Sequence, residues 1–192
     1  EVSNENQEEI STILEQAEKL DFLIQSLVKL SRMESGIIAV HSEDTTIKQM
    51  LESIQQQFNV KVREKNITLS LCDTDLHVLC DSKWTVEALG NIVDNAIKYT
   101  ACGGNVQIKV EQYSFFVKID IIDDGIGIEK EEIPKIFGRF YRSLSVADQL
   151  GVGIGLFLAR EIIQAQKGYI KVTSEREKGS TFSVFLPISK KE

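Results

Sequence analysis

Apolar residues recur along the first part of the chain at the spacing of a helix. Over residues 5–33, apolar or small residues fall alternately three and four positions apart, at Ile10, Ile13, Ala17, Leu20, Ile24 and Leu27. This period predicts one long helix with a seam for a partner helix. Further apolar residues widen the face beyond a two-stranded seam and favour a helical bundle; they are Leu14, Leu23 and Leu30. An amphipathic helix packed on its own domain is the alternative interpretation.

After a linker-like Glu34-Ser35-Gly36, strand and helix patterns alternate. Strands are expected at 37–41, 67–72, 77–80, 106–112, 115–122, 169–173 and 180–186. Helices are expected at 47–58 after a Thr45 or Thr46 cap, at 82–99 with Ser82 as N-cap, at 129–136, and at 153–166 ending near Gly168. Residues 137–152 lack a regular pattern, and a loop of this length is usually functional. The order predicts an α+β fold with helices on one face of a largely antiparallel sheet.

Composition narrows the class of protein. The 192 residues suffice for one domain or one domain with a smaller appendage, and 42% hydrophobic content supports a real core. A net charge of −7 argues against nucleic-acid binding. We find no signal peptide and no apolar run near the roughly 18 residues that cross a bilayer. The three cysteines lack metal-ligand spacing, which indicates reduced thiols in a cytoplasmic protein. Because the chain begins with Glu1 rather than Met, we expect a fragment of a longer protein.

The segment Asp123-Asp124-Gly125-Ile126-Gly127-Ile128 follows an apolar strand pattern and carries the first candidate chemistry. Glycines at 125 and 127 allow positive φ and a close approach of the backbone to a flat ligand. Asp123, held at a strand end, can accept a hydrogen bond from an exocyclic amine such as that of adenine. The alternative for this segment alone is a plain tight turn.

Two asparagines lie four residues apart in the helix expected at 82–99. Asn91 and Asn95 therefore share a face, although asparagine is a poor residue for a helix interior. Their amide oxygens suit a magnesium ion that also binds phosphates. Lys98 and Tyr99 follow one turn later, where a cation and a ring could contact a nucleotide. The alternative is a solvated polar face.

A second glycine cluster, Gly151-Val152-Gly153-Ile154-Gly155-Leu156, opens the last expected helix. Backbone N–H groups at a helix N-terminus can bind phosphate, although the segment lacks the lysine and hydroxyl of a P-loop. It could equally be a hinge. Before it, Ile136-Phe137-Gly138-Arg139-Phe140-Tyr141-Arg142 offers aromatic anchors for a lid and Arg142 for a terminal phosphate. The alternative here is a small apolar patch beneath a loop.

In this order, N-I-V-D-N-A-I-K-Y-T, D-D-G-I-G-I, I-F-G-R-F-Y-R and G-V-G-I-G-L closely resemble the nucleotide-binding boxes of sensor histidine kinases. The closing G-S-T-F-S-V-F-L-P is similar too, so the resemblance spans about Thr45 to Pro187. The first helix resembles the second helix of that family's dimerisation and phosphotransfer hairpin. The resemblance thus divides the chain into a partial hairpin at 1–35 and an ATP-binding catalytic domain at 36–192.

The resemblance implies a two-layer α/β sandwich that binds ATP and Mg²⁺ between the asparagine helix and a flexible lid. It implies that Asn95 coordinates magnesium with Asn91 close by, that Lys98 and Arg142 face phosphates, and that Asp123 reads the adenine amine. The other implied ligand-binding residues line or shape the pocket; they are Tyr99, Gly125, Gly127, Ile128, Gly151, Gly153, Gly155, Leu156 and Thr181. The implied partners are a response regulator and a second copy of the chain through the first helix. Nucleic acid is not among them, and a membrane would be reached only through upstream segments.

The chain departs from the family pattern at several positions. The family's acceptor histidine lies on the first hairpin helix, whereas His41 and His77 lack that motif, so we expect no autophosphorylation at the usual position. Asn91 replaces the general-base glutamate of related ATPases, which favours phosphotransfer over hydrolysis. Val152 and Asp124 stand where a small hydroxyl residue and an asparagine are frequent in the family, and Asp124 is expected to add negative charge near the pocket. The rival functions are ATP hydrolysis and a non-catalytic nucleotide-sensing dimer.

Overall fold

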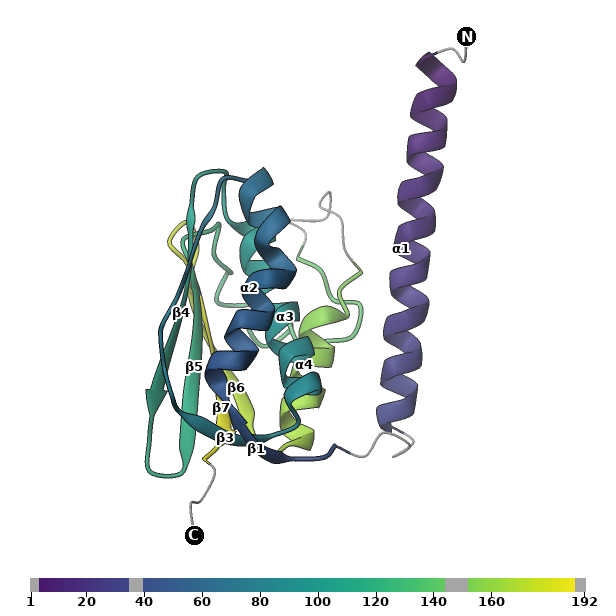
Figure 1. Ribbon diagram of the computed structural model, residues 1–192. Coiled ribbons are helices and arrows are strands. Elements are labelled where there is room, and N and C mark those ends of the chain that lie inside the picture. The colour runs from purple at the N-terminus through teal and green to yellow at the C-terminus, as the bar shows by residue number, and fades with distance from the viewer. Residues whose placement is uncertain (1–3, 35–39, 144–151, 189–192) are drawn as a thin grey trace.

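The computed structural model describes residues 4–34, 40–143 and 152–188. Three helices, α2 (Ile47–Glu64), α3 (Ser82–Tyr99) and α4 (Gly155–Ala165), cover one face of a five-stranded sheet (Figure 1). The strands lie in the order β2 (Thr68–Leu71), β4 (Asn105–Gln112), β5 (Phe116–Asp123), β7 (Gly179–Pro187) and β6 (Tyr169–Glu175). Only β2 and β4 pair in parallel, so the predicted α+β sandwich with a largely antiparallel sheet is confirmed.

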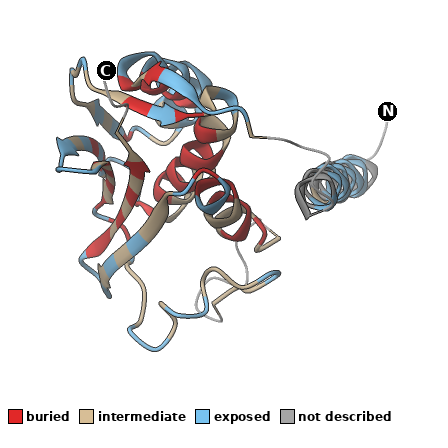
Figure 2. Cartoon of the chain, turned by 90° about the horizontal axis from the view of Figure 1, so that it is seen from below, coloured by how far each residue is buried: buried red, intermediate tan, exposed pale blue. Residues whose placement is uncertain are grey.

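Strand alternation places the core between the sheet and the helices (Figure 2). On β5, Val117, Ile119 and Ile121 are fully buried, and the residues between them face the open side of the sheet. Met50 and Ile54 of α2 meet this layer with no exposed surface. The period-two pattern of the strands and the three-to-four spacing of the helices thus bury one face of each.

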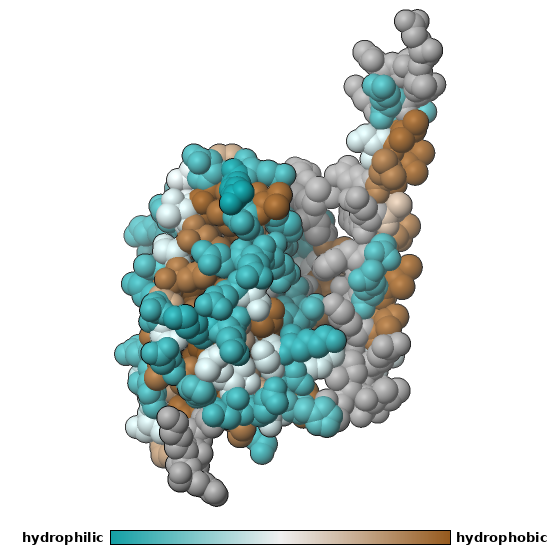
Figure 3. Space-filling model, viewed as in Figure 1, coloured by the Kyte–Doolittle hydropathy of each residue, from teal (hydrophilic) through white to brown (hydrophobic). Residues whose placement is uncertain are grey.

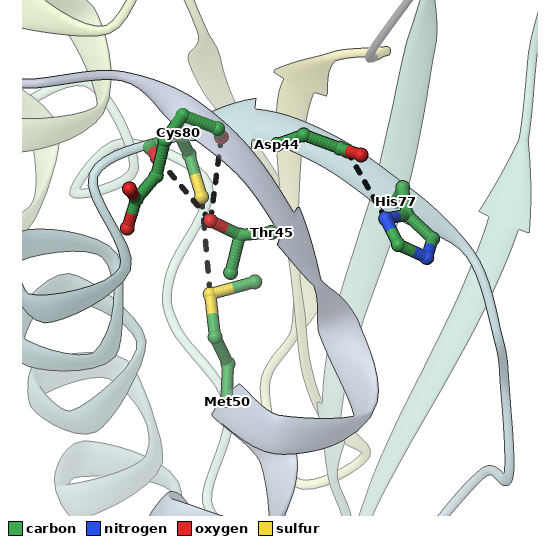
Figure 4. A network of polar contacts seen from close by, with 6 residues as sticks. Asp44, Thr45, Met50, His77 and Cys80 are labelled. Carbon is green, nitrogen blue, oxygen red and sulfur yellow. Dashed lines mark hydrogen bonds and ion pairs between the residues drawn. The ribbon is translucent and has the colours of Figure 1, made fainter. Parts of the chain in front are cut away.

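A small second sheet closes the domain beside α2. Strands β1 (Glu43–Thr46) and β3 (His77–Cys80) pair antiparallel, and Figure 4 shows their polar contacts. The single proton of Thr45 Oγ1 is shared between the backbone carbonyls of Glu43 and Cys80, at 3.3 and 3.5 Å, and the Cys80 thiol lies 3.9 Å from Met50 Sδ. Burial raises the pKa of Cys80, which keeps its thiol protonated. The strand predicted at 77–80 is confirmed, whereas that at 37–41 falls largely outside the described residues and the observed strand is β1.

Helix α1 (Asn4–Glu34) confirms the long first helix and stands beside the sandwich (Figure 1). Ile13 and Ile24 are 67% and 60% exposed, and Figure 3 shows apolar surface along the outward side of the helix. Among its leucines, Leu23 is partly buried against the core of the sandwich. Because most of the seam faces solvent, the alternative of an amphipathic helix packed on its own domain is wrong.

Some element boundaries differ from expectation for local physical reasons. Asp81, not Ser82, caps α3, because its Oδ1 accepts the Trp84 N–H at 3.1 Å. The helix expected at 129–136 is a series of turns around Pro134. At the end of α4, the left-handed residue is Lys167 (φ +62), while the Gly168 N–H donates to the Ile163 carbonyl at 3.0 Å.

Helix α2 extends to Glu64, six residues beyond the predicted end at Phe58. Its added turns are largely exposed, which is why no apolar period marked them. At the C-cap that follows these turns, Lys65 Nζ donates to the Ile97 and Lys98 carbonyls at 2.8 and 2.6 Å. The extension therefore holds the end of α3.

Candidate functional site

A cavity of about 180 Å³ opens between α3, the segment after β5 and the start of α4. It brings together residues of α3, of the end of β5 and the segments that follow it, of the start of α4, and of β7. Most of the predicted site residues line it; they are Asn91, Asn95, Lys98, Tyr99, Asp123, Gly127, Ile128, Arg142, Gly153, Gly155 and Leu156. Gly151 lies outside the described residues.

Asp123 ends β5 and is 7% exposed. One carboxylate oxygen, Oδ1, accepts the backbone N–H groups of Gly125 at 3.0 Å and Ser180 at 3.3 Å. Within the described part of the chain no hydrogen bond is recorded to Oδ2, which leaves that oxygen to a ligand in the cavity. Burial raises the pKa of Asp123 to about 6, opposed by the two backbone N–H groups. At pH 7 the group is therefore an ionised acceptor held in a fixed orientation.

The glycine segment after Asp123 follows a path that side chains would block. Gly127 has φ +67, and a Cβ there would lie 2.1 Å from the Glu175 carbonyl oxygen. Gly125 does not line the cavity, but a Cβ on it would meet the Tyr99 carbonyl oxygen at 2.6 Å. The segment is thus pressed between α3 and the β6–β7 hairpin, which fixes the wall that Ile128 and Gly127 present to the cavity.

The two asparagines of α3 both face the cavity, as their spacing predicted. Asn91 Nδ2 is buried and has no hydrogen-bond partner in the described structure. A buried amide donor without an acceptor fits a ligand rich in oxygen, such as a phosphate. A Cβ on Gly155 would lie 3.2 Å from Asn91 Oδ1, so α4 begins directly against this side chain.

The donor set also fits a magnesium ion that is shared with phosphates. Asn95 and the carboxylates of Asp94 and Glu132 line the cavity and are hard oxygen ligands. Among the described residues no cluster of three or more acidic, histidine or cysteine side chains could hold a metal alone. Magnesium accepts such a sparse set because it keeps water and phosphate oxygens as ligands.

Two cations converge on the same cavity. Lys98 and Arg142 both line it, and the pKa of Lys98 is lowered by burial and further by the charge of Arg142. Lys98 Nζ lies 4.9 Å from the centroid of the Tyr99 ring. Burial raises the pKa of the Tyr99 phenol, so this side chain stays neutral. Two partly desolvated cations side by side favour an anionic ligand, since its charge relieves their repulsion.

Comparison with known proteins decides the family. The family of histidine kinase-, DNA gyrase B- and HSP90-like ATPases matches residues 80–190, which is more than half of the chain. The chain belongs to this family. Among curated relatives it is 30% identical over 171 residues to the sensor protein kinase PmrB of Pseudomonas aeruginosa, covering 88% of this chain and 36% of PmrB. To the sensor histidine kinase WalK of Bacillus subtilis it is 32% identical over 182 residues, covering 92% of this chain and 30% of WalK.

A solved structure agrees with the family assignment. The mycobacterial sensor histidine kinase MprB is 25% identical with a TM-score of 0.68, covering 77% of this chain and 97% of that chain. The described part of this chain contains no helix long and apolar enough to cross a membrane. The chain spans about a third of the length of the two curated relatives.

One expectation about the adenine end needs revision. Thr181 does not line the cavity, because alternation along β7 turns it to the opposite face of the sheet from Ser180 and Phe182, which do. Asp124 does not line the cavity, but its negative charge contributes to the raised pKa of Asp123, in line with the expectation of added charge near the pocket. Its carboxylate accepts the Asn105 backbone N–H at 2.8 Å and the Asn105 side-chain amide at 2.7 Å, and these bonds lower the pKa of Asp124.

Several cavity residues were not singled out from the sequence. Ser180 and Asp94 each adjoin a predicted residue, and only the strand register or the helix face could have shown which neighbour faces inward. Glu132 comes from the region expected as a helix, and its carboxylate accepts the Tyr141 and Ser143 hydroxyls at 3.1 and 2.8 Å. No spacing in the sequence indicated that contact.

Proposed function

We propose that this chain contains the ATP-binding kinase domain of a two-component sensor histidine kinase. In this proposal it transfers the γ-phosphoryl group of ATP to a histidine on a dimerisation domain, for relay to a response regulator. The observation that carries the proposal is the cavity itself. A buried carboxylate acceptor, Asp123, shares one small cavity with two cations, Lys98 and Arg142, and with the amide of Asn95. That set matches a purine amine, a polyphosphate and its metal.

Each side chain has a defined task in this proposal. Asp123 accepts a hydrogen bond from the adenine amine, and Gly127 with Ile128 lies against the ring. Lys98 and Arg142 bind phosphate oxygens, and the Asn91 amide donates to a phosphate oxygen or to metal-bound water. Asn95 holds magnesium, which when bound neutralises phosphate charge. Phosphoryl transfer needs positioning and charge stabilisation more than covalent chemistry from the protein, and these groups supply both.

The partners of the carboxylates support transfer over hydrolysis. Hydrolysis needs a general base to orient and deprotonate water, and Asn91 cannot accept a proton in that role. Of the other acidic residues at the cavity, Asp94 is 2.6 Å from Lys61 Nζ, and Glu132 accepts two hydroxyl hydrogen bonds. Neither carboxylate is therefore placed as a general base, although each keeps oxygen lone pairs that magnesium could use. An Asn91→Glu variant should release phosphate faster than the unmutated chain, and rapid release without the substitution would contradict the proposal.

The N-terminal helix defines the remaining part of the proposal. We assign residues 1–35 to the second helix of a dimerisation hairpin and 36–192 to the catalytic domain. The solvent-facing apolar residues of α1 support a homodimer in the full-length protein, and the catalytic domain would act in the cytoplasm. Neither histidine suits the acceptor role, since His77 is on β3 with its Nδ1 3.0 Å from Asp44 and His41 lies outside any helix, two residues before β1.

Calorimetric titration with ATP, with and without magnesium, tests the nucleotide site. Binding should weaken in an Asp123→Ala variant with and without metal, and the gain from magnesium should shrink in Asn95→Ala. Labelled ATP tests transfer. Label should appear on an added polypeptide that carries the acceptor helix and not on this chain alone. Absence of any heat with ATP would overturn the proposal.

A further inference from the structure

A single hydroxyl outside the cavity bonds to two segments that line it. Ser174 lies on β6, directly opposite Ser180 of β7 in the strand register. Its Oγ accepts the Ile128 backbone N–H at 2.8 Å, donates to the Gly179 carbonyl at 2.9 Å and lies 3.0 Å from Ser180 Oγ. Ser174 itself does not line the cavity, whereas Ser180 does.

Counting protons fixes the direction of the bond between the two serines. A serine hydroxyl has one proton to donate and two lone pairs to accept with. The Ser174 proton goes to the Gly179 carbonyl, which can only accept. The Ser180 hydroxyl must then donate its proton to Ser174. Toward a ligand in the cavity, Ser180 Oγ is therefore a hydrogen-bond acceptor.

Ser180 is also tied to Asp123. Its backbone N–H donates to Asp123 Oδ1 at 3.3 Å, so the hydroxyl of Ser180 and the carboxylate of Asp123 sit at the same end of the cavity. Both are acceptors when the carboxylate is ionised. A 6-amino purine presents N–H donors to such a pair, whereas a 6-oxo purine presents an oxygen whose lone pairs oppose it.

We propose that Ser174 is a positioning residue that sets nucleobase specificity, by holding the Ser180 hydroxyl as an acceptor toward the purine edge. This inference rests on the proposed ATP site and concerns discrimination rather than binding itself. Without Ser174, the Ser180 hydroxyl regains its proton and can rotate to donate to a 6-oxo group. The chain should then distinguish the two classes of purine less well.

The test compares dissociation constants for ATP and inosine triphosphate by calorimetry on the whole chain. Relative to the unmutated chain, Ser174→Ala should lower the preference for ATP about three- to tenfold, the value of one hydrogen bond. Ser183→Ala, which alternation along β7 places on the opposite face of the sheet, should leave the preference unchanged. In a Ser180→Ala background, Ser174→Ala should have no further effect on the preference, because the hydroxyl it orients is gone.

A merely structural role predicts a different pattern. Ser174→Ala would then weaken both nucleotides equally, and that result would overturn the inference while leaving the ATP site intact. The same holds if the preference falls just as far in the Ser180→Ala background. Should Ser174→Ala fail to fold, Ser174→Thr and Ser174→Val form a matched pair that differs in one hydroxyl, and only the threonine variant should keep the preference. Failure of the unmutated chain to bind either nucleotide would instead overturn the proposed function and this inference with it.

Discussion

Replacing Asp123 with asparagine should make the ligand-free protein more stable and the nucleotide site weaker. The carboxylate is buried, and its pKa rises from an ordinary value of 3.8 to about 6. In the folded chain the group therefore binds its proton more tightly than in the unfolded chain. Stability is undiminished below pH 3.8, falls as the pH rises from there to about 6, and stays low above it.

The size of this effect follows from the shift. A rise of roughly 2 pKa units at about 1.36 kcal/mol each means that ionised Asp123 costs the fold up to about 3 kcal/mol at pH 7. Asparagine keeps the shape and the acceptor for the Gly125 and Ser180 N–H groups but carries no charge. Asp123→Asn should thus raise the melting temperature by up to about 6–12 °C, at roughly 2–4 °C per kcal/mol for a chain of this size.

The same substitution should impair binding, because the two backbone N–H groups fix which atom faces the cavity. The asparagine oxygen would take the place of Oδ1, so its NH₂ group would meet the N–H donors of adenine. A lost hydrogen bond plus an unsatisfied donor costs about 1–3 kcal/mol, or roughly 5- to 150-fold in Kd. In the unmutated chain ATP should also bind more weakly as the pH falls below about 6, where Asp123 takes up its proton.

Urea unfolding of both proteins at pH 7 and pH 4 provides the assay. Trp84, the single tryptophan, lies in the first turn of α3 and reports on the sandwich. The stability difference should be large at pH 7 and small at pH 4. Equal stability at pH 7, or a difference that does not change with pH, would refute the reasoning about desolvation of this carboxylate.

Three further substitutions test other parts of the structure. Gly127→Ala should cost more than about 2 kcal/mol of unfolding free energy, because φ is +67 and the Cβ would lie 2.1 Å from a carbonyl oxygen. Lys65→Met should cost about 1–2 kcal/mol, since its Nζ donates to two carbonyls at the end of α3 at 2.8 and 2.6 Å. Asn95→Ala should reduce the gain in ATP affinity from magnesium about tenfold and leave metal-free binding nearly unchanged. Denaturation measures the first two and calorimetry the third.

Matched controls separate these causes. Gly103 also has a positive φ, +82, but nothing lies within 4 Å of its Cβ position, so Gly103→Ala should cost only about 1 kcal/mol. An equal loss of unfolding free energy in the two alanine variants would contradict a steric clash at Gly127. Lys65→Arg should retain part of the stability that the methionine variant loses. Asn59→Ala on the exposed face of α2 should not alter the magnesium dependence.

The spacing and the type of the hydrophobic residues were enough to predict most of the fold. The β-branched and aromatic residues of 115–122 predicted the strand that β5 forms, and the seam in residues 5–33 predicted the first helix. The end of α2 could not be predicted, because its last turns are largely exposed and carry no apolar signal. The segment around Pro134 resembles a helix in composition, but it forms turns whose Glu132 bonds to hydroxyls nine and eleven residues away.

The candidate site, too, could be predicted from the sequence only in part. Asn91 and Asn95 could be placed on one face from their spacing alone, and Asp123 from its position at a strand end. Ser180 could not be distinguished from Thr181, because the choice depends on which face of β7 meets the helices. That register is set by pairing with β5 and β6, which are distant in sequence.

The far end of α4 is fastened to the base of α3 by buried side chains. Gln166, 3% exposed, accepts the Asp81 backbone N–H at 2.6 Å and the Thr85 hydroxyl at 3.1 Å. Sliding one helix along the other would break these hydrogen bonds. The buried polar groups would then lack partners, which costs free energy of folding. We therefore expect the two helices to move as one body, with any rearrangement on ligand binding confined to the mouth of the site.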